Sequence, residues 1–465
     1  MKETQTQFKL PGVPQAKQGR EVPPQWDWTE ASVWTERMLA TLERGIKGGK
    51  WFSLMDKVWK LENLQSALAQ VSRNGGAAGV DGQRCQEYLQ HAPERLQGLQ
   101  RKLQRGDYQP QPVKRVWIPK LGSKELRPLG IPVVEDRVTQ TALRNVIEPI
   151  FENIFAEHSY GFRPGRGAKD ALRRVDHLLK SGRNWVVDAD LKGYFDSIPQ
   201  DKLMEAVKEH MADGAVLRLI ESFLKQGVME SGKGWKPTEA GTPQGAVISP
   251  LLANLYLNPL DHLMVRHGQE MVRYADDFVI LCQSKEEAQE TLEHLKQWVA
   301  AAGLVLHPVK SRIVDANAPG GFDFLGYHFE RGHRWPREKS LQKYRDAIRP
   351  KTPRMRSGPM SQIVGEVNRT LRGWFEYFKH SIANVMERED KGVRHRLRAM
   401  LRKRHCRGQR DKRPRNQRWP NACFAELGLF SLARLRGFEG SFENLRSASA
   451  SFSRRQPCKT PKKWL

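Results

Sequence analysis

The chain has 465 residues, too many for a single compact core, so its length predicts two to four packed units. Hydrophobic residues make up 39% of the chain and Trp occurs 13 times, which excludes a wholly disordered protein. The formal net charge is +26, and residues 331–465 alone carry 35 Lys and Arg against 11 Asp and Glu. This local excess predicts a polyanionic partner, although a basic tail that binds nonspecifically would give the same count.

The sequence carries no signal for a disulfide framework, a zinc site or a membrane span. Its five Cys residues lie far apart and form no C-x-x-C pair. No run of 18 apolar residues occurs, and the opening stretch MKETQTQFKL lacks the apolar core of a secretory signal. These features predict a soluble, cytoplasmic protein without a membrane partner.

The first part of the chain is predicted to be a polar lead of about 30 residues, followed by helices and one hairpin. Apolar residues recur at helical spacing in 34–42, 54–71, 137–155 and 169–180. The glycine-rich stretch 74–82 predicts a turn. Two short strands within 108–132, joined by the loop LGSKE, predict a hairpin that presents basic side chains.

Three Asp residues interrupt apolar, strand-like segments farther along. Asp190 ends the run WVVDAD, and Asp276 and Asp277 lie within EMVRYADDFVILC. A carboxylate in such a segment is costly without a cation. Nucleotidyl transfer uses two Mg²⁺ ions, held by oxygen ligands, to stabilise the attacking and leaving oxygens. The three residues are therefore candidate metal ligands, although an acidic pair in a hairpin turn is by itself more often structural.

Three segments, in this order, resemble signature blocks of reverse transcriptases: Asp190–Ile198 (DLKGYFDSI), Gly241–Leu257 (GTPQGAVISPLLANLYL) and Arg273–Ile280 (RYADDFVI). Gly79–Gly82 and Tyr160–Leu172 resemble blocks typical of bacterial group II intron reverse transcriptase/maturases. The resemblance extends from about residue 51 to residue 432. It implies an RNA-directed DNA polymerase, which is a nucleotidyltransferase.

The resemblance also implies a metal site. Asp190, Asp276 and Asp277 would be catalytic, and with the backbone carbonyl of Leu191 they would hold two Mg²⁺ ions, for which Mn²⁺ is a substitute.

Further residues would line the nucleotide pocket. Phe195 would lie under the sugar as a gate against a 2′ hydroxyl, although a core aromatic would suit the same position. Gln244 and Gly245 would lie near the sugar, although TPQG alone would be an ordinary turn. Ala275 would leave room for the nucleotide.

Three cations are implied at the nucleotide phosphates. Lys120 and Arg127 would fold over the triphosphate from the predicted hairpin, although exposed hairpin cations usually serve solubility. Lys310 would lie near the phosphates and protonate pyrophosphate.

Primer and template contacts are implied on both sides of the acids. Arg163 and Arg166, in a glycine-rich turn, suit a template backbone. Tyr274 would pack beside the primer end. The segment FLGY resembles a primer-grip turn, although it suits plain core packing equally; its residues are Phe324, Leu325 and Gly326.

The basic C-terminal third resembles the thumb, or maturase, region of this family. Asn368–His380 would form a helix with an aromatic packing face, and Lys391–Arg418 contains 13 Lys and Arg against one acid. Contact with several phosphates would give salt-sensitive affinity for structured RNA. The implied RNA-binding residues are Arg369, Arg372, Lys379, Arg394, Arg398, Arg402, Lys403 and Arg404.

The implied fold is α+β: a right-hand polymerase, with a small antiparallel sheet in the palm, followed by an all-α thumb or maturase domain. The expected divisions are an N-terminal extension (1–50), fingers (51–165), palm (166–335), helical thumb (336–432) and a basic, Ser-rich tail (433–465).

The implied role is to bind an intron RNA, assist its splicing and copy it into DNA from a DNA primer or target, using deoxynucleoside triphosphates. The protein would associate with the bacterial nucleoid when bound to DNA, and a homodimer is one further expectation. Two alternatives are a free-standing reverse transcriptase, as used in phage defence, and an RNA-binding maturase without polymerase activity. An RNA-dependent RNA polymerase fits less well, because Phe195 and YADD favour DNA synthesis.

Overall fold

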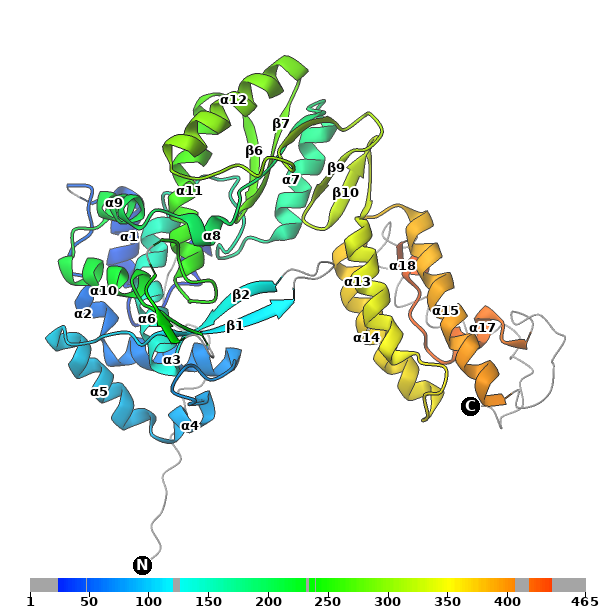
Figure 1. Cartoon of the computed structure of the whole chain (residues 1–465), viewed down its shortest axis with the longest axis horizontal. Coiled ribbons are helices and arrows are strands. Elements are labelled where there is room, and N and C mark those ends of the chain that lie inside the picture. The colour runs from blue at the N-terminus through cyan, green and yellow to red at the C-terminus, as the bar shows by residue number, and fades with distance from the viewer. Residues whose placement is uncertain are drawn as a thin grey trace, which may run out of the picture. The chain divides into compact units, whose positions relative to one another are not determined.

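A computed structural model describes residues 24–436 apart from 47, 120–125, 231–233, 239 and 406–417. The chain forms two compact units, which divide between Ile313 and Val314. Within the described residues, helices and two four-stranded sheets precede a three-stranded sheet and a final group of helices (Figure 1). The predicted α+β class, with a small antiparallel sheet and a helical C-terminal region, is confirmed. None of the described helices combines the length and the apolar character needed to cross a bilayer.

Helices begin the N-terminal unit. Helix α3 buries Leu64, Ala67, Leu68 and Val71, which share one helical face at the spacing i, i+3, i+4, i+7. This face packs on α6, which is buried along most of its length and forms the centre of the unit. The helices are η1 (Pro24–Trp26), α1 (Glu36–Arg44), α2 (Met55–Val58), α3 (Leu61–Asn74), α4 (Cys85–Gln90), α5 (Ala92–Arg105) and α6 (Val134–Glu152).

The predicted hairpin is present as β1 (Val113–Pro119) and β2 (Leu126–Ile131), which pair antiparallel. Strand β1 also pairs in parallel with β4 (Val228–Glu230), and β4 pairs antiparallel with β5 (Gly234–Lys236). The sheet order is therefore β2-β1-β4-β5.

A buried acid anchors the base of this hairpin. Asp136 of α6 is 1% exposed, and its carboxylate accepts hydrogen bonds from the Tyr108 hydroxyl (2.5 Å), the Gln111 backbone N–H (3.0 Å) and the Gln226 side-chain amide (2.9 Å). Burial raises the pKa of Asp136 to about 7, although these hydrogen bonds lower it. The folded unit therefore holds a proton here over a pH range in which the unfolded chain has lost it.

We expect Asp136→Asn to remove a pH-dependent part of the stability. Because the pKa of Asp136 is raised from 3.8 to about 7, its contribution is fully present below about pH 4 and is lost as the pH rises through about 7. The free energy of unfolding of the wild type minus that of Asp136→Asn should fall by up to about 1.4 kcal/mol per pH unit across this range. Urea denaturation measures both values, and a difference independent of pH would contradict the assignment.

The second sheet, here called the palm sheet, has the order β6-β7-β3-β8. Its strands are β3 (Trp185–Asp190), β6 (Glu270–Tyr274), β7 (Asp277–Cys282) and β8 (Arg312–Asp315). Helices α7 (Ala168–Lys180) and α12 (Lys285–Ala301) both pack on β7. Successive residues of β7, from Phe278 to Cys282, are buried, which explains the unbroken apolar run in the sequence. The other helices of this region are α8 (Tyr194–Ser197), α9 (Gln200–His210), α10 (Gly214–Leu224) and α11 (Ser249–Arg266).

The C-terminal unit opens with an antiparallel sheet of β9 (Phe322–Phe324), β10 (Tyr327–Glu330) and β11 (His333–Pro336). Tyr327 of this sheet donates its hydroxyl to the Tyr377 carbonyl of α14 (2.6 Å), and its ring lies 4.9 Å from that of Phe378. The sheet precedes the boundary expected near residue 335, yet these contacts join it to the helices that follow. Those helices are α13 (Glu338–Ile348), η2 (Arg349–Lys351), α14 (Met360–Phe378), α15 (Ala383–His405), α17 (Asn421–Glu426) and α18 (Leu432–Arg436).

Candidate active site

The register of the palm sheet brings the three acids to one end of it. Asp190, the last residue of β3, lies opposite Asp277, the first residue of β7, and Asp277 lies opposite Tyr274 of β6. Ala275 and Asp276 form the turn between β6 and β7, where Ala275 has a φ of +60°. The small Ala side chain tolerates this left-handed backbone better than a bulky one would. Two distant sequence blocks therefore meet here.

The carboxylates of Asp276 and Asp190 are close enough to repel each other. Burial raises the pKa of Asp276, Asp190 raises it further, and Arg127 and Arg273 lower it. Asp190 in turn pairs with Lys310, whose Nζ lies 2.5 Å from Asp190 Oδ2. Asp190 and Asp276 therefore form a site of concentrated negative charge. A cation placed between the two carboxylates would relieve their repulsion, as Lys310 already does in part for Asp190.

The donors around this pair suit a hard divalent cation. In the described part of the chain, no group of three or more His, Cys, Asp or Glu side chains is placed to hold a metal ion together. Asp190 lies close enough to Asp276 to raise its pKa, and Asp277, the next residue, is exposed. Mg²⁺ is commonly held by one or two carboxylates together with substrate phosphates and water. The Leu191 carbonyl can supply a further oxygen ligand. The backbone hydrogen bonds on either side of it are made by the Asp190 carbonyl and the Lys192 N–H, not by the Leu191 carbonyl. The residues present therefore fit the predicted metal.

A buried ion pair, which the sequence interpretation missed, holds the turn. Arg273 is fully buried, and its guanidinium donates to the two Asp261 carboxylate oxygens at 2.8 and 2.5 Å. It also donates to the Asn254 side chain (2.8 Å) and to the Ala275 carbonyl (3.0 Å). Asp261 and Asn254 belong to α11, so this helix is tied to the turn that presents Asp276. The sequence signal was a cation within an apolar strand and polar residues within an apolar helix.

A loop that precedes α7 packs on the same turn. The Tyr160 N–H donates to a backbone carbonyl of β6 at 2.8 Å. A Cβ on Gly161 would lie 2.2 Å from the Ala275 nitrogen, so only glycine fits at this position. Phe162 follows with a φ of +57° and an exposed ring, whose centroid lies 6.4 Å from that of Tyr274. The loop therefore places an exposed aromatic ring beside the acids, which the sequence interpretation did not foresee.

Helix α8, which follows β3, and the segment Gly241–Gly245 pack together. The Phe195 carbonyl accepts a backbone N–H of this segment at 2.7 Å, and the Phe195 ring is half-buried. Gln244 Nε2 donates to Asp196 Oδ2 at 3.2 Å, while the Gln244 carbonyl accepts a backbone N–H of β2 at 2.6 Å. The structure thus brings two of the predicted nucleotide-pocket segments to one place, next to the hairpin.

Two of the three predicted phosphate contacts lie near the acids. Arg127 is exposed on β2 and is close enough to lower the pKa of both Asp276 and Asp196. Lys310 is the partner of Asp190. Lys120 lies outside the described residues.

Two family models match the chain. The model described as "Reverse transcriptase (RNA-dependent DNA polymerase)" matches residues 118–329, and "Group II intron, maturase-specific domain" matches residues 341–419. Protein YkfC of Escherichia coli is 32% identical over 310 residues, which cover 59% of this chain and 80% of YkfC. The chain belongs to the group II intron reverse transcriptase/maturase family.

A second relative gives a shorter match. Group II intron-encoded protein LtrA of Lactococcus lactis is 40% identical over 173 residues, which cover 37% of this chain but only 28% of LtrA. Among solved structures, a chain of a partial Cas6-RT-Cas1–Cas2 complex is 25% identical with a TM-score of 0.35, over 53% of this chain and 41% of that one. The two matched domains imply a nucleic-acid partner, and reverse transcriptase domains generally use divalent metal ions.

Within the reverse transcriptase domain, Arg163 is buried rather than available to a template. It is 6% exposed, and its guanidinium donates to the Glu152 carboxylate (2.7 Å) and to the carbonyls of Ala156 (2.5 Å) and Ser159 (2.7 Å). The predicted template contact is wrong for Arg163, because these internal acceptors engage its donors. Arg166 is partly exposed, and its template contact stays a prediction.

In the maturase-specific domain, two of the predicted RNA-binding cations are largely buried and contact other residues of the protein. Arg398 is 7% exposed and donates to the Trp419 carbonyl (2.8 Å) and to the Asn421 side chain (2.7 Å). Arg394 is largely covered and lies 3.8 Å from the buried carboxylate of Asp390. RNA contact is therefore wrong for Arg398 and is not favoured for Arg394.

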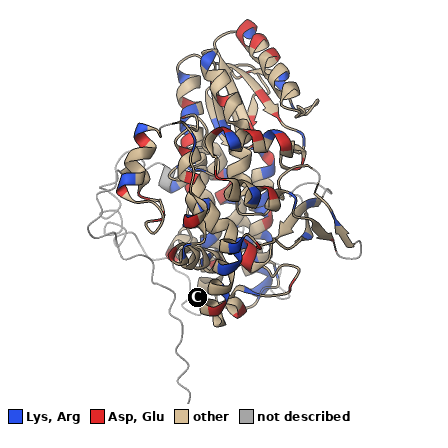
Figure 2. Ribbon diagram, turned by 90° about the vertical axis from the view of Figure 1, so that its left-hand side faces the viewer, with Lys and Arg blue, Asp and Glu red and all other residues tan. Residues whose placement is uncertain are grey.

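The remaining predicted RNA-binding cations differ in exposure. Lys379 is half-buried, and Arg404 donates to backbone carbonyls of the loop before α14. Lys and Arg are interspersed with Asp and Glu over the described helices (Figure 2). The exposed ones among the predicted set are Arg369, Arg372, Arg402 and Lys403.

The predicted primer-grip segment forms the turn between β9 and β10. Leu325 and Gly326 have φ values of +46° and +84°, which makes this a tight hairpin turn. The Leu325 carbonyl accepts the Tyr377 hydroxyl at 2.8 Å, and the Gly326 carbonyl accepts the Ser340 hydroxyl at 2.9 Å. Helices α14 and α13 therefore fix the turn from two sides, while Phe324 is buried beneath it.

Proposed function

We propose that this chain is an active RNA-directed DNA polymerase that extends a DNA primer on an RNA template. The observation that carries the proposal is the meeting of Asp190 and Asp276, from separate sequence blocks, at one end of the palm sheet with Lys310 and Arg127 beside them. Arg273 and α11 hold this arrangement from behind. Such a costly concentration of charge is expected at a catalytic site rather than at a structural turn.

Each group then has a chemical role in the proposed reaction. Asp190, Asp276 and the Leu191 carbonyl would hold the divalent ions, proposed to be Mg²⁺, with Asp277 as the third acid. When bound, the ions stabilise negative charge on the attacking and leaving oxygens. Arg127 offers forked hydrogen bonds to the triphosphate. Lys310 exchanges its pairing with Asp190 for the departing pyrophosphate, to which its Nζ brings a proton.

We further propose that the C-terminal unit binds intron RNA and supports splicing. The maturase-specific match at residues 341–419 and the exposed cations of α14 and α15 support this role. The divisions into fingers (51–165), palm (166–335) and thumb (336–432) stay proposals, and the sheet β9–β11 at the end of the proposed palm packs on the helices of the proposed thumb. Because the LtrA match covers only 28% of that protein, splicing, priming and mobility rest on the family alone.

Primer extension tests the proposed polymerase. Purified protein is incubated with a labelled DNA primer on an RNA template, the four deoxynucleoside triphosphates and Mg²⁺. We expect extension to the template end that stops on addition of EDTA and resumes with excess Mg²⁺. Protein that binds the primer and template but adds no nucleotide with either Mg²⁺ or Mn²⁺ would contradict the proposal and favour a maturase without polymerase activity.

Phe195→Ala should relax the choice of sugar. Phe195 belongs to α8, whose backbone bonds the segment containing Gln244, and its ring is half-buried. In the proposed pocket, loss of the ring opens space where a 2′ hydroxyl would lie. We expect the ratio of kcat/KM for a deoxynucleotide over that for the matching ribonucleotide to fall by about tenfold or more, a change of about 1.4 kcal/mol. Steady-state single-nucleotide insertion measures the ratio; an unchanged ratio in a folded variant would mean that Phe195 is only a core residue.

A further inference from the structure

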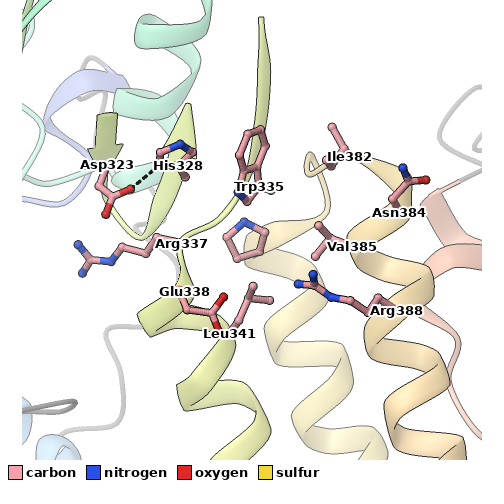
Figure 3. Close-up of a pocket in the computed structure, with 11 residues that line it drawn as sticks. Asp323, His328, Trp335, Arg337, Glu338, Leu341, Ile382, Asn384, Val385 and Arg388 are labelled. Carbon is pink, nitrogen blue, oxygen red and sulfur yellow. Dashed lines mark hydrogen bonds and ion pairs between the residues drawn. The ribbon is translucent and has the colours of Figure 1, made fainter. Parts of the chain in front are cut away.

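The C-terminal unit contains a cavity of about 590 Å³ that the proposed polymerase does not use. It lies between β9–β11, the start of α13 and the start of α15 (Figure 3). Its volume falls within the range of roughly 300–1,000 Å³ typical of small-molecule sites. Its lining includes residues from the maturase-specific match, among them Leu341, Val385 and Arg388.

The cavity combines an apolar floor with an aromatic wall. Leu341 and Val385 are 2% and 7% exposed, and Pro336 beside them is buried. The partly exposed Trp335 indole forms the wall; its ring lies 4.9 Å from that of His328. A flat, apolar-faced group is the kind of ligand that such a slot accepts.

Two exposed charged side chains at the rim of the cavity, one basic and one acidic, could orient a ligand. Arg388 is 57% exposed, and in Figure 3 its guanidinium reaches from α15 toward Leu341. Its Nε donates to the Glu389 carboxylate (3.3 Å), both oxygens of which also accept from Arg345, at 3.2 and 2.7 Å. Across the cavity, Asp323 accepts from the His328 ring through Oδ1 (2.8 Å) and is 44% exposed, which leaves Oδ2 as an acceptor.

We propose that this cavity receives one unpaired base of an RNA strand. Trp335 would stack on the base, Arg388 would bind the adjoining phosphate, and the Asp323 carboxylate would accept from an exocyclic amine of the base. A base with such an amine, namely adenine, cytosine or guanine, is therefore favoured over uracil, whose pairing edge is mostly acceptors. The proposal deepens the proposed RNA-binding role of this unit and rests on it. The charge of residues 331–465 favours a polyanion over an uncharged metabolite.

Binding of short homopolymer RNA to the full chain tests this proposal. Fluorescein-labelled A12, C12 and U12 are titrated with wild type, Trp335→Leu, Arg388→Gln and the control Arg369→Gln, which removes an exposed cation of α14 that does not line the cavity. We expect the wild type to bind A12 and C12 more tightly than U12. Trp335→Leu should weaken A12 binding about tenfold and U12 binding little, as expected for the loss of one stacked base.

The two arginine variants separate the cavity from general electrostatics. Each should reduce the salt dependence of binding by about 0.7 in the logarithmic slope. Only Arg388→Gln should also lower the preference for A12 over U12, because only that phosphate adjoins the base. If Trp335→Leu unfolds, the preference measured for Arg388→Gln decides the matter.

Equal affinity of the wild type for the three oligonucleotides, or an unchanged preference in both cavity variants, would overturn the proposal. Either of these results can be told apart from failure of the proposed polymerase and from failure of RNA binding in general. Primer extension reports on the palm, and the shared affinity for all three oligonucleotides reports on the basic surface.

Discussion

Asp276→Asn should abolish primer extension while leaving the protein folded and able to bind RNA. The substitution keeps the size of the side chain but removes the charge that would hold the divalent ions. Loss of several kcal/mol of transition-state stabilisation corresponds to a rate lower by a factor on the order of 1,000 or more. Single-turnover extension measures this rate.

The thermal stability of Asp276→Asn should not fall together with its activity. Burial and the nearby Asp190 carboxylate raise the pKa of Asp276, so the ionised group opposes folding in the absence of metal. Asp276→Asn should therefore unfold at the same temperature as the wild type or a higher one in EDTA. Asp188→Asn is the matched control, since Asp188 lies two residues before Asp190 in β3 and pairs with Arg312 at 3.5 Å. Wild-type extension by Asp276→Asn, or an equal loss in Asp188→Asn, would contradict the assignment.

Asp261→Ala should destabilise the N-terminal unit by about 3–5 kcal/mol. The change leaves the guanidinium of Arg273, which is 0% exposed, buried without its carboxylate partner. Urea or thermal denaturation measures the loss, and extension should fall with it. A loss below about 1 kcal/mol would show that water or another group satisfies Arg273.

A double variant separates stability from positioning. Replacing a buried ion pair by apolar residues of similar volume is often neutral or stabilising, so Arg273→Met with Asp261→Leu should recover most of the stability. It would still lack the hydrogen bond from Arg273 to the Ala275 carbonyl, which fixes the turn carrying Asp276. We expect a stable protein with kcat reduced at least about tenfold and little change in KM. Full activity would mean that the pair only stabilises the fold.

The parts of the site that depend on local pattern were predictable from sequence. The Asp residues that interrupt apolar segments of the sequence at 190 and 276, and the helical repeat of α3, each produce a signal within a short window. The palm sheet then adds what the sequence lacks, namely the register that places Asp190 opposite Asp277.

Burial of cations was the least predictable feature. Arg163 and Arg398 look like nucleic-acid contacts in a basic, glycine-rich or helical context, yet both are buried against partners that tertiary structure supplies. Arg273 of β6 is likewise buried against a partner from another element, Asp261 of α11. By contrast, the spacing of Arg394 and Asp390, four residues apart on one helix, does predict their pairing.

The most direct test of the central claim is to locate Mn²⁺ in a crystal of the protein bound to primer, template and a nonhydrolysable deoxynucleotide. Anomalous scattering should show Mn²⁺ at the end of the palm sheet, ligated by carboxylate oxygens of both Asp190 and Asp276, with Lys310 displaced from Asp190. Mn²⁺ that binds elsewhere, or an ion pair between Lys310 and Asp190 that persists in this complex, would contradict the account.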